Sequence, residues 1–160
     1  NGDHTKASFN WDLFVIAGNA RTSALAAGGA LNDDSIFACP DGLWCDQNSR
    51  LWIQTDMGDI GPDYEGPLKE FCMNMLLAAD PATGEIKRFM TGPWGQECTG
   101  VVSTPDGKTM FVNFQHPGAQ GSGEDFAVGK YGSQFPDYDG TVPRSATVVI
   151  TKDDGGVIGA

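Results

Sequence analysis

Apolar and polar positions alternate over short runs along most of the chain, and the runs end at clusters of Gly, Pro, Asn and Asp. This pattern predicts strands joined by turns. Stretch 40–56 is the clearest case, with strands predicted at 43–45 and 51–55 and a polar turn at 46–50. The same pattern returns at 99–115, where Gly100 takes the place of Gly42 and the turn falls at 105–108. We predict a β-hairpin in each stretch.

Two more strand-like runs separate these hairpins, so the repeat predicts four-stranded blades. Residues 73–80 form the third strand of the first blade and 86–90 the fourth, around a turn at 80–85, which gives a blade over 39–92. The second blade covers 97–160, with strands at 145–151 and 157–159 after a Gly-rich insertion at 117–143.

The expected fold is therefore all-β, with about two four-stranded antiparallel blades plus one extra strand at 9–18. Residues 19–38 are expected to form a long loop, with one weak helical turn at 22–27. Closed β-propellers typically have four to eight blades, so 1–160 is predicted to be a single fragment of a propeller domain that does not close alone.

Charge and hydropathy exclude some partners. The formal net charge is −11, with 21 acidic and 10 basic residues, which argues against nucleic acid because its binders concentrate Lys and Arg. An acidic chain can simply be soluble, or it can use some acidic residues to bind hard cations such as calcium. No apolar run reaches the roughly 18 residues of a membrane span.

The four cysteines, Cys39, Cys45, Cys72 and Cys98, form no CxxC pair and have no His at zinc-finger spacing. Cys39 and Cys45 lie six residues apart in a stretch predicted to be extended, which is too far for a disulfide. We expect buried free thiols.

Four motifs in order, PDGLWCDQNSRLWIQTD, NMLLAADPATGEIKRFMTGP, ECTGVVSTPDGKTMFVNFQHPG and PRSATVVITKDDGGVIGA, resemble the C-terminal portion of the PhoX-type bacterial alkaline phosphatases. The resemblance covers nearly the whole chain. It implies a six-bladed propeller-like phosphatase, exported folded by the twin-arginine route to the periplasm or the exterior. Such enzymes hydrolyse phosphate esters with calcium and iron at the centre of the ring. Family members are several times longer, so this chain alone is expected to be inactive.

Candidate metal ligands are the carboxylates at the starts of the two innermost strands, which line the central channel of a propeller. Glu97 is a lone carboxylate in a neutral stretch, and the resemblance favours it as a ligand over an exposed turn residue. Asp41 has the matching place in the first hairpin, but Pro-Asp-Gly is also a common turn sequence, as at 105–107. Cys39 could present a thiolate to a soft metal, although an inert thiol is the simpler interpretation.

Candidate catalytic residues are His116, which could orient a phosphate or bind iron, and Arg144, which could grip phosphate oxygens. Arg88 is a weaker candidate of the same kind. Each could instead be a solvated surface group. Trp44, Trp52, Phe111 and Phe114 are expected to pack between blades.

Two other functions stay open from the sequence. One is a calcium-dependent lactonase-type propeller hydrolase, which uses similar turns; the other is a non-catalytic propeller module for binding or assembly. Whatever the function, exposed strand edges and blade faces predict self-association of the isolated chain.

Overall fold

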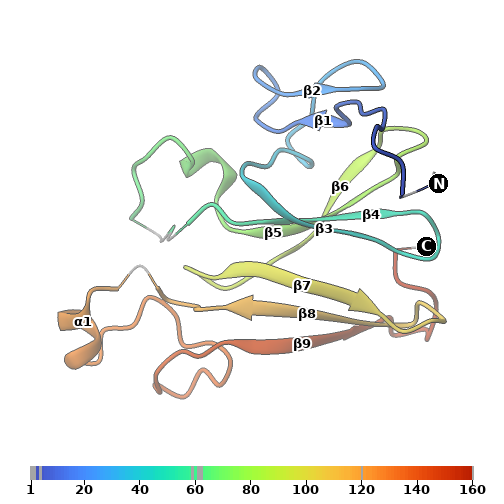
Figure 1. The fold of residues 1–160 in the computed structure, drawn as a ribbon. Helices are drawn as coiled ribbons and strands as arrows, with labels where there is room; N and C mark the ends of the chain where they lie inside the picture. Colours follow the sequence, from blue (N-terminus) through green and yellow to red (C-terminus); the bar gives the residue numbers. More distant parts are fainter. Residues whose placement is uncertain (1–2, 4, 59, 61–62, 120, 160) are drawn as a thin grey trace.

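The computed structural model describes residues 3, 5–58, 60, 63–119 and 121–159. Three antiparallel sheets lie one above another in chain order in Figure 1. The first pairs β1 (Val15–Ile16) with β2 (Ala24–Leu25). The second has the order β3 (Pro40–Cys45), β4 (Leu51–Thr55), β5 (Met75–Ala79), β6 (Ile86–Thr91), and the third has β7 (Glu97–Ser103), β8 (Thr109–Gln115), β9 (Ala146–Thr151).

The described helices are short: a 3₁₀ turn, η1 (Lys69–Phe71), and α1 (Gly123–Ala127), which lies in the predicted insertion. The all-β prediction is therefore confirmed. The described residues form a stack of sheets and not a closed propeller ring. Among them, no helix is both long enough and apolar enough to cross a membrane.

Both predicted hairpins form, and side chains close their turns. In the first, the Asp46 carboxylate accepts hydrogen bonds from the backbone N–H groups of Asn48 and Arg50. In the second, the Thr104 hydroxyl donates to Asp106 at 2.6 Å. The third and fourth strands of the first blade are also confirmed, and the N–H of Asp80 donates to the Glu85 carbonyl across their turn.

Alternation along the central strands of the four-stranded sheet sends side chains into two cores. On β4, Trp52 faces the three-stranded sheet and Ile53 faces the N-terminal segment; on β5, Leu76 and Leu77 divide in the same way. Because both faces are covered, this sheet is the central layer of the stack. The core between the two larger sheets contains Trp52, Leu76, Cys98, Val101, Met110, Val112, Phe114 and Ile158.

Two predictions for the N-terminal segment need correction. The predicted strand 9–18 is reduced to β1, because residues 9–13 pair with no strand and leave Phe9 and Trp11 exposed. The predicted helical turn at 22–27 is replaced by β2.

Among the described residues of the second blade, three strands form and not four. Residues 157–159 turn away from β9, because Ile158 is buried between the sheets and its N–H donates to the Gly107 carbonyl at 2.9 Å. The guanidinium of Arg50 binds the Ile158 carbonyl at 2.8 Å and completes this anchor.

The prediction of buried thiols holds for Cys98 alone; Cys39, Cys45 and Cys72 are exposed. Of the aromatic residues expected between blades, Trp52 and Phe114 are buried. Trp44 is half-buried against the core between the sheets, and Phe111 is half-buried on the opposite, outer face of β8.

Candidate functional site

The first strands of the two larger sheets, β3 and β7, lie side by side and begin at the same end of the molecule (Figure 1). Each is the edge strand of its sheet. Asp41 lies near the start of β3, and Glu97 is the first residue of β7. The fold therefore brings the two strand starts that carry the predicted carboxylates to one end of the sheets.

Glu97 is well shielded for a carboxylate, with its side chain 14% exposed. It pairs in register with Gln115, whose amide nitrogen donates to Glu97 Oε2 at 2.7 Å. The imidazole Nε2 of His116 lies 3.5 Å from the same oxygen. The structure thus brings together two of the predicted site residues, Glu97 and His116. It adds Gln115, a residue that could have been predicted from the sequence because the hairpin pairs it directly with Glu97.

The orientation of His116 is fixed by its backbone and by its second ring nitrogen. Its N–H donates to the Ser145 hydroxyl at 2.9 Å, and its φ of 39° is in the left-handed region that non-glycine residues rarely adopt. Ring Nδ1 lies 3.1 Å from the Gly95 carbonyl. Since a carbonyl only accepts, this contact places a proton on Nδ1 and leaves Nε2, in the neutral ring, with a lone pair on the Glu97 side.

A buried amide network holds the start of β7. Asn74 donates to the Gln96 carbonyl at 2.7 Å, and the Gln96 side-chain nitrogen returns a bond to the Asn74 carbonyl at 3.0 Å. Asn74 Oδ1 also accepts from the Thr55 hydroxyl and the Met57 N–H. The backbone next to Glu97 is therefore tied to the four-stranded sheet, a role that periodicity does not reveal.

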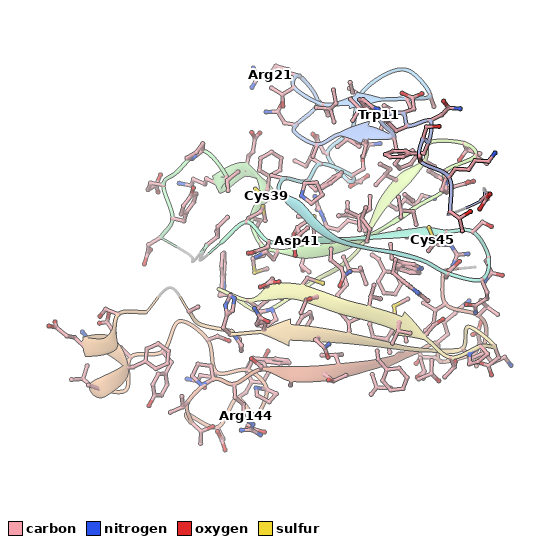
Figure 2. The ribbon with its side chains drawn as sticks, viewed as in Figure 1. Trp11, Arg21, Cys39, Asp41, Cys45 and Arg144 are labelled. Atoms are coloured by element: carbon pink, nitrogen blue, oxygen red, sulfur yellow. The ribbon has the colours of Figure 1, made fainter. Side chains whose placement is uncertain are left out.

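The remaining candidates lie on or next to other strands: Asp41 on β3, Arg88 on β6 and Arg144 before β9. Figure 2 shows Asp41 on β3, on one side of the three-stranded sheet, and Arg144 on the other side. Asp41 is exposed, and Arg144 forms an ion pair with Asp137 in the insertion. Arg88 binds the carbonyls of loop residues Asp33 and Ile36, which indicates a structural role.

Cys98, directly after Glu97, is poorly suited to bind a metal. Burial raises the pKa of the Cys98 thiol to about 12, and the neighbouring Glu97 charge raises it further, so the thiol stays protonated. Cys39, the cysteine considered above as a thiolate ligand, is exposed, and its backbone φ of 50° lies in the left-handed region.

Glu97 and His116 are both residue types that bind metals, but two side chains do not complete a metal site. A carboxylate oxygen is a ligand that calcium prefers, and imidazole suits iron. A metal-binding His commonly donates its other ring N–H to a carbonyl, as His116 does to Gly95. The described residues contain no group of three or more His, Cys, Asp or Glu side chains placed to hold a metal ion. They therefore provide part of a ligand set.

Comparisons with known proteins agree with the sequence motifs. The family model for alkaline phosphatase PhoX matches residues 1–118, a range that includes Asp41, Glu97 and His116. A solved structure of Pseudomonas fluorescens PhoX in complex with vanadate, a transition state analogue, is 42% identical, with a TM-score of 0.73. That match covers 94% of this chain and 24% of the solved chain. No curated protein matched the chain. The chain belongs to the PhoX alkaline phosphatase family.

Proposed function

We propose that this chain is part of a secreted, metal-dependent phosphatase that hydrolyses phosphate monoesters. Family membership carries the proposal, together with the vanadate complex of the P. fluorescens relative. Vanadate is described there as a transition state analogue, and it resembles a phosphoryl group during transfer. By the family resemblance, we place the enzyme in the periplasm or outside the cell, after twin-arginine export.

Glu97 is the residue of this chain that we assign to metal binding, with calcium and iron as the cofactors. The Gln115 amide donates to one carboxylate oxygen, Oε2, and so holds the carboxylate in place. His116 supports the same site through Nε2, with its ring fixed by Gly95. Asp41, on the adjacent strand start, is the second proposed ligand.

When bound, the metal ions would neutralise charge on the phosphoryl oxygens. The roles of this chain's residues are to hold and orient. Glu97 and Asp41 present carboxylate oxygens, and His116 places Nε2 beside Glu97. Arg144 is the residue that we propose binds phosphate, which requires its guanidinium to exchange Asp137 for a phosphate oxygen.

The isolated chain is proposed to be inactive, because the described residues supply only part of a ligand set and the chain spans 24% of the solved relative. We also propose that it self-associates through the free edges of β3 and β9 or through its open sheet face. Light scattering at roughly tens of micromolar tests this, because an unpaired strand edge is a template for pairing with another chain. A monodisperse monomer would contradict it.

The test of function is hydrolysis of a simple aryl phosphate with calcium and iron supplied, comparing this chain with the full-length protein. We expect activity in the full-length protein alone. Activity in neither form would contradict the phosphatase assignment, and equal activity in both would contradict the need for further ligands.

A further inference from the structure

Arg144 has a different environment from Arg50 and Arg88. Those two side chains bind backbone carbonyls and hold segments of the fold together. The Arg144 side chain is 60% exposed, and its guanidinium donates to the carboxylate of Asp137, whose side chain is 38% exposed. It lies at the surface, before the start of β9 (Figure 2). A dissolved anion can therefore reach its charge.

A short path of bonds joins Arg144 to the candidate site. The next residue, Ser145, accepts the His116 N–H through its hydroxyl oxygen at 2.9 Å, and His116 Nε2 lies 3.5 Å from Glu97. The exposed cation thus precedes a residue that is bonded directly to the Glu97 and His116 pair.

The turn that carries Asp137 is anchored by the residues around it. The N–H of Arg144 donates to the Phe135 carbonyl at 3.0 Å, and the Phe135 ring packs on the core residue Phe114, with ring centroids 5.4 Å apart. The Tyr138 ring packs edge-on against the same Phe135 ring, at 6.3 Å. The turn is thus held in place, whereas the guanidinium ends a long, flexible side chain. A change of partner therefore moves the Arg144 side chain and leaves the carboxylate where it is.

A second carboxylate, Asp139, lies in the field of the same guanidinium. Hydrogen bonds from Thr141 lower the pKa of the Asp139 carboxyl, and the positive charge of Arg144 lowers it further. Asp139 accepts the Thr141 N–H at 3.0 Å, whereas Asp137 binds the guanidinium directly. A phosphate that approaches Arg144 is therefore repelled by two carboxylates and has to displace Asp137.

Phosphate is a stronger partner for a guanidinium than this carboxylate is. It presents several charged oxygens to the fork of N–H groups, whereas the bond to Asp137 joins one nitrogen, Nη1, to one oxygen, Oδ2. An ion pair as exposed as this one is only slightly favoured over its broken form. The pair therefore forms without phosphate and breaks when phosphate binds.

We propose that Asp137 is an internal competitor of phosphate. Its carboxylate binds the Arg144 guanidinium when phosphate is absent, releases it to a phosphate oxygen on binding, and binds it again as inorganic phosphate leaves. Asp137 is a positioning residue, because it acts through Arg144. This inference rests on the proposed function, since it requires Arg144 to bind phosphate.

The test is the affinity of the metal-loaded full-length protein for inorganic phosphate, measured by isothermal titration calorimetry. A ligand that needs the broken pair binds more weakly in proportion to the fraction of molecules in which the pair is broken. For an exposed pair this factor is about 2–6, so Asp137→Asn is expected to tighten phosphate binding by about 2–6-fold. A loss of structure would weaken binding instead.

Asp154→Asn is the matched control, because it removes the same charge from an exposed pair with Lys152, beyond the other end of β9. We expect it to leave the phosphate affinity unchanged. An Asp137→Asn affinity equal to that of the control would overturn the proposal.

A double-mutant cycle separates competition from a general effect of charge. Arg144→Ala is expected to weaken phosphate binding, and Asp137→Asn added to it should change nothing more, because the competitor then has no guanidinium to bind. Equal tightening by Asp137→Asn with and without Arg144 would overturn the proposal.

The same cycle distinguishes this inference from the proposed function. If Arg144→Ala weakens binding while Asp137→Asn has no effect, the competition is wrong and the assignment of Arg144 to phosphate stands. If Arg144→Ala leaves phosphate binding unchanged, that assignment is wrong and the competition with it.

Discussion

Asn74→Ala tests whether the buried amide network stabilises the fold. Asn74 is 4% exposed and makes three side-chain hydrogen bonds, to the Thr55 hydroxyl, the Met57 N–H and the Gln96 carbonyl, at 2.7–2.9 Å. Truncation leaves the last two, both backbone groups, without these partners. Each unsatisfied buried group costs about 1–3 kcal/mol, so we expect a loss of about 2–6 kcal/mol in the free energy of unfolding.

The assay is urea unfolding followed by tryptophan fluorescence, since Trp52 is fully buried between the sheets. Asn48→Ala, in the exposed turn of the first hairpin, is the matched control, with an expected change within about 0.5 kcal/mol. Equal, small effects of both substitutions would refute the reasoning. A loss confined to Asn74→Ala would support it, and in the full-length protein the same variant should lower activity by releasing the strand start at Glu97.

Three other predictions follow from burial and titration. Trp52→Ala removes a fully buried side chain that contacts Phe89 edge-on, and should cost about 3–5 kcal/mol in urea unfolding, whereas Trp11→Ala, on an exposed side chain, should cost little. Cys98 should resist alkylation at pH 8 while the other three cysteines react, as peptide mass spectrometry would show; rapid native labelling of Cys98 would contradict its burial and raised pKa. A hydrogen bond from the Thr104 hydroxyl, and then one from the Lys108 N–H, lower the pKa of the Asp106 carboxyl in the folded protein. The ionised carboxylate therefore stabilises the fold fully above the ordinary Asp pKa of about 4, and this stabilisation is lost as the pH falls through the lowered pKa. Asp106→Asn should therefore reduce the loss of stability on acidification, and an unchanged pH profile would argue against this contribution.

Much of the fold could be predicted from the sequence, because its strands carry local signals. The hairpins at 40–55 and 97–115 have alternating apolar residues and turn chemistry at fixed places. The Leu and Met residues of 73–80 suit a helix as well as a strand, but the turn at 80–85 and the alternating run behind it indicate a strand, and β5 forms there. The failures occurred where tertiary contacts decide: the run from Phe9 to Leu13 has strand propensity but no partner, and Ile158 enters the core instead of extending the sheet.

The site was predictable only in part. Glu97 and His116 could be proposed from their places at a strand start and a hairpin end, and the fold brings them within 3.5 Å. Sequence position did not reveal that Arg144 pairs with Asp137, because this contact depends on how the irregular insertion folds. It also did not reveal that Asn74 supports the backbone beside Glu97, because that contact joins segments 22 residues apart.

The most direct test of the Glu97 assignment is Glu97→Gln in the full-length protein, with bound calcium and iron and aryl phosphate turnover measured together. Glu85→Gln, on an exposed turn carboxylate, is the matched control. We predict that Glu97→Gln loses bound metal and at least about 10–100-fold in turnover, the range typical for disturbing a metal site, while the control keeps both. Unchanged metal content and turnover in Glu97→Gln would contradict the account.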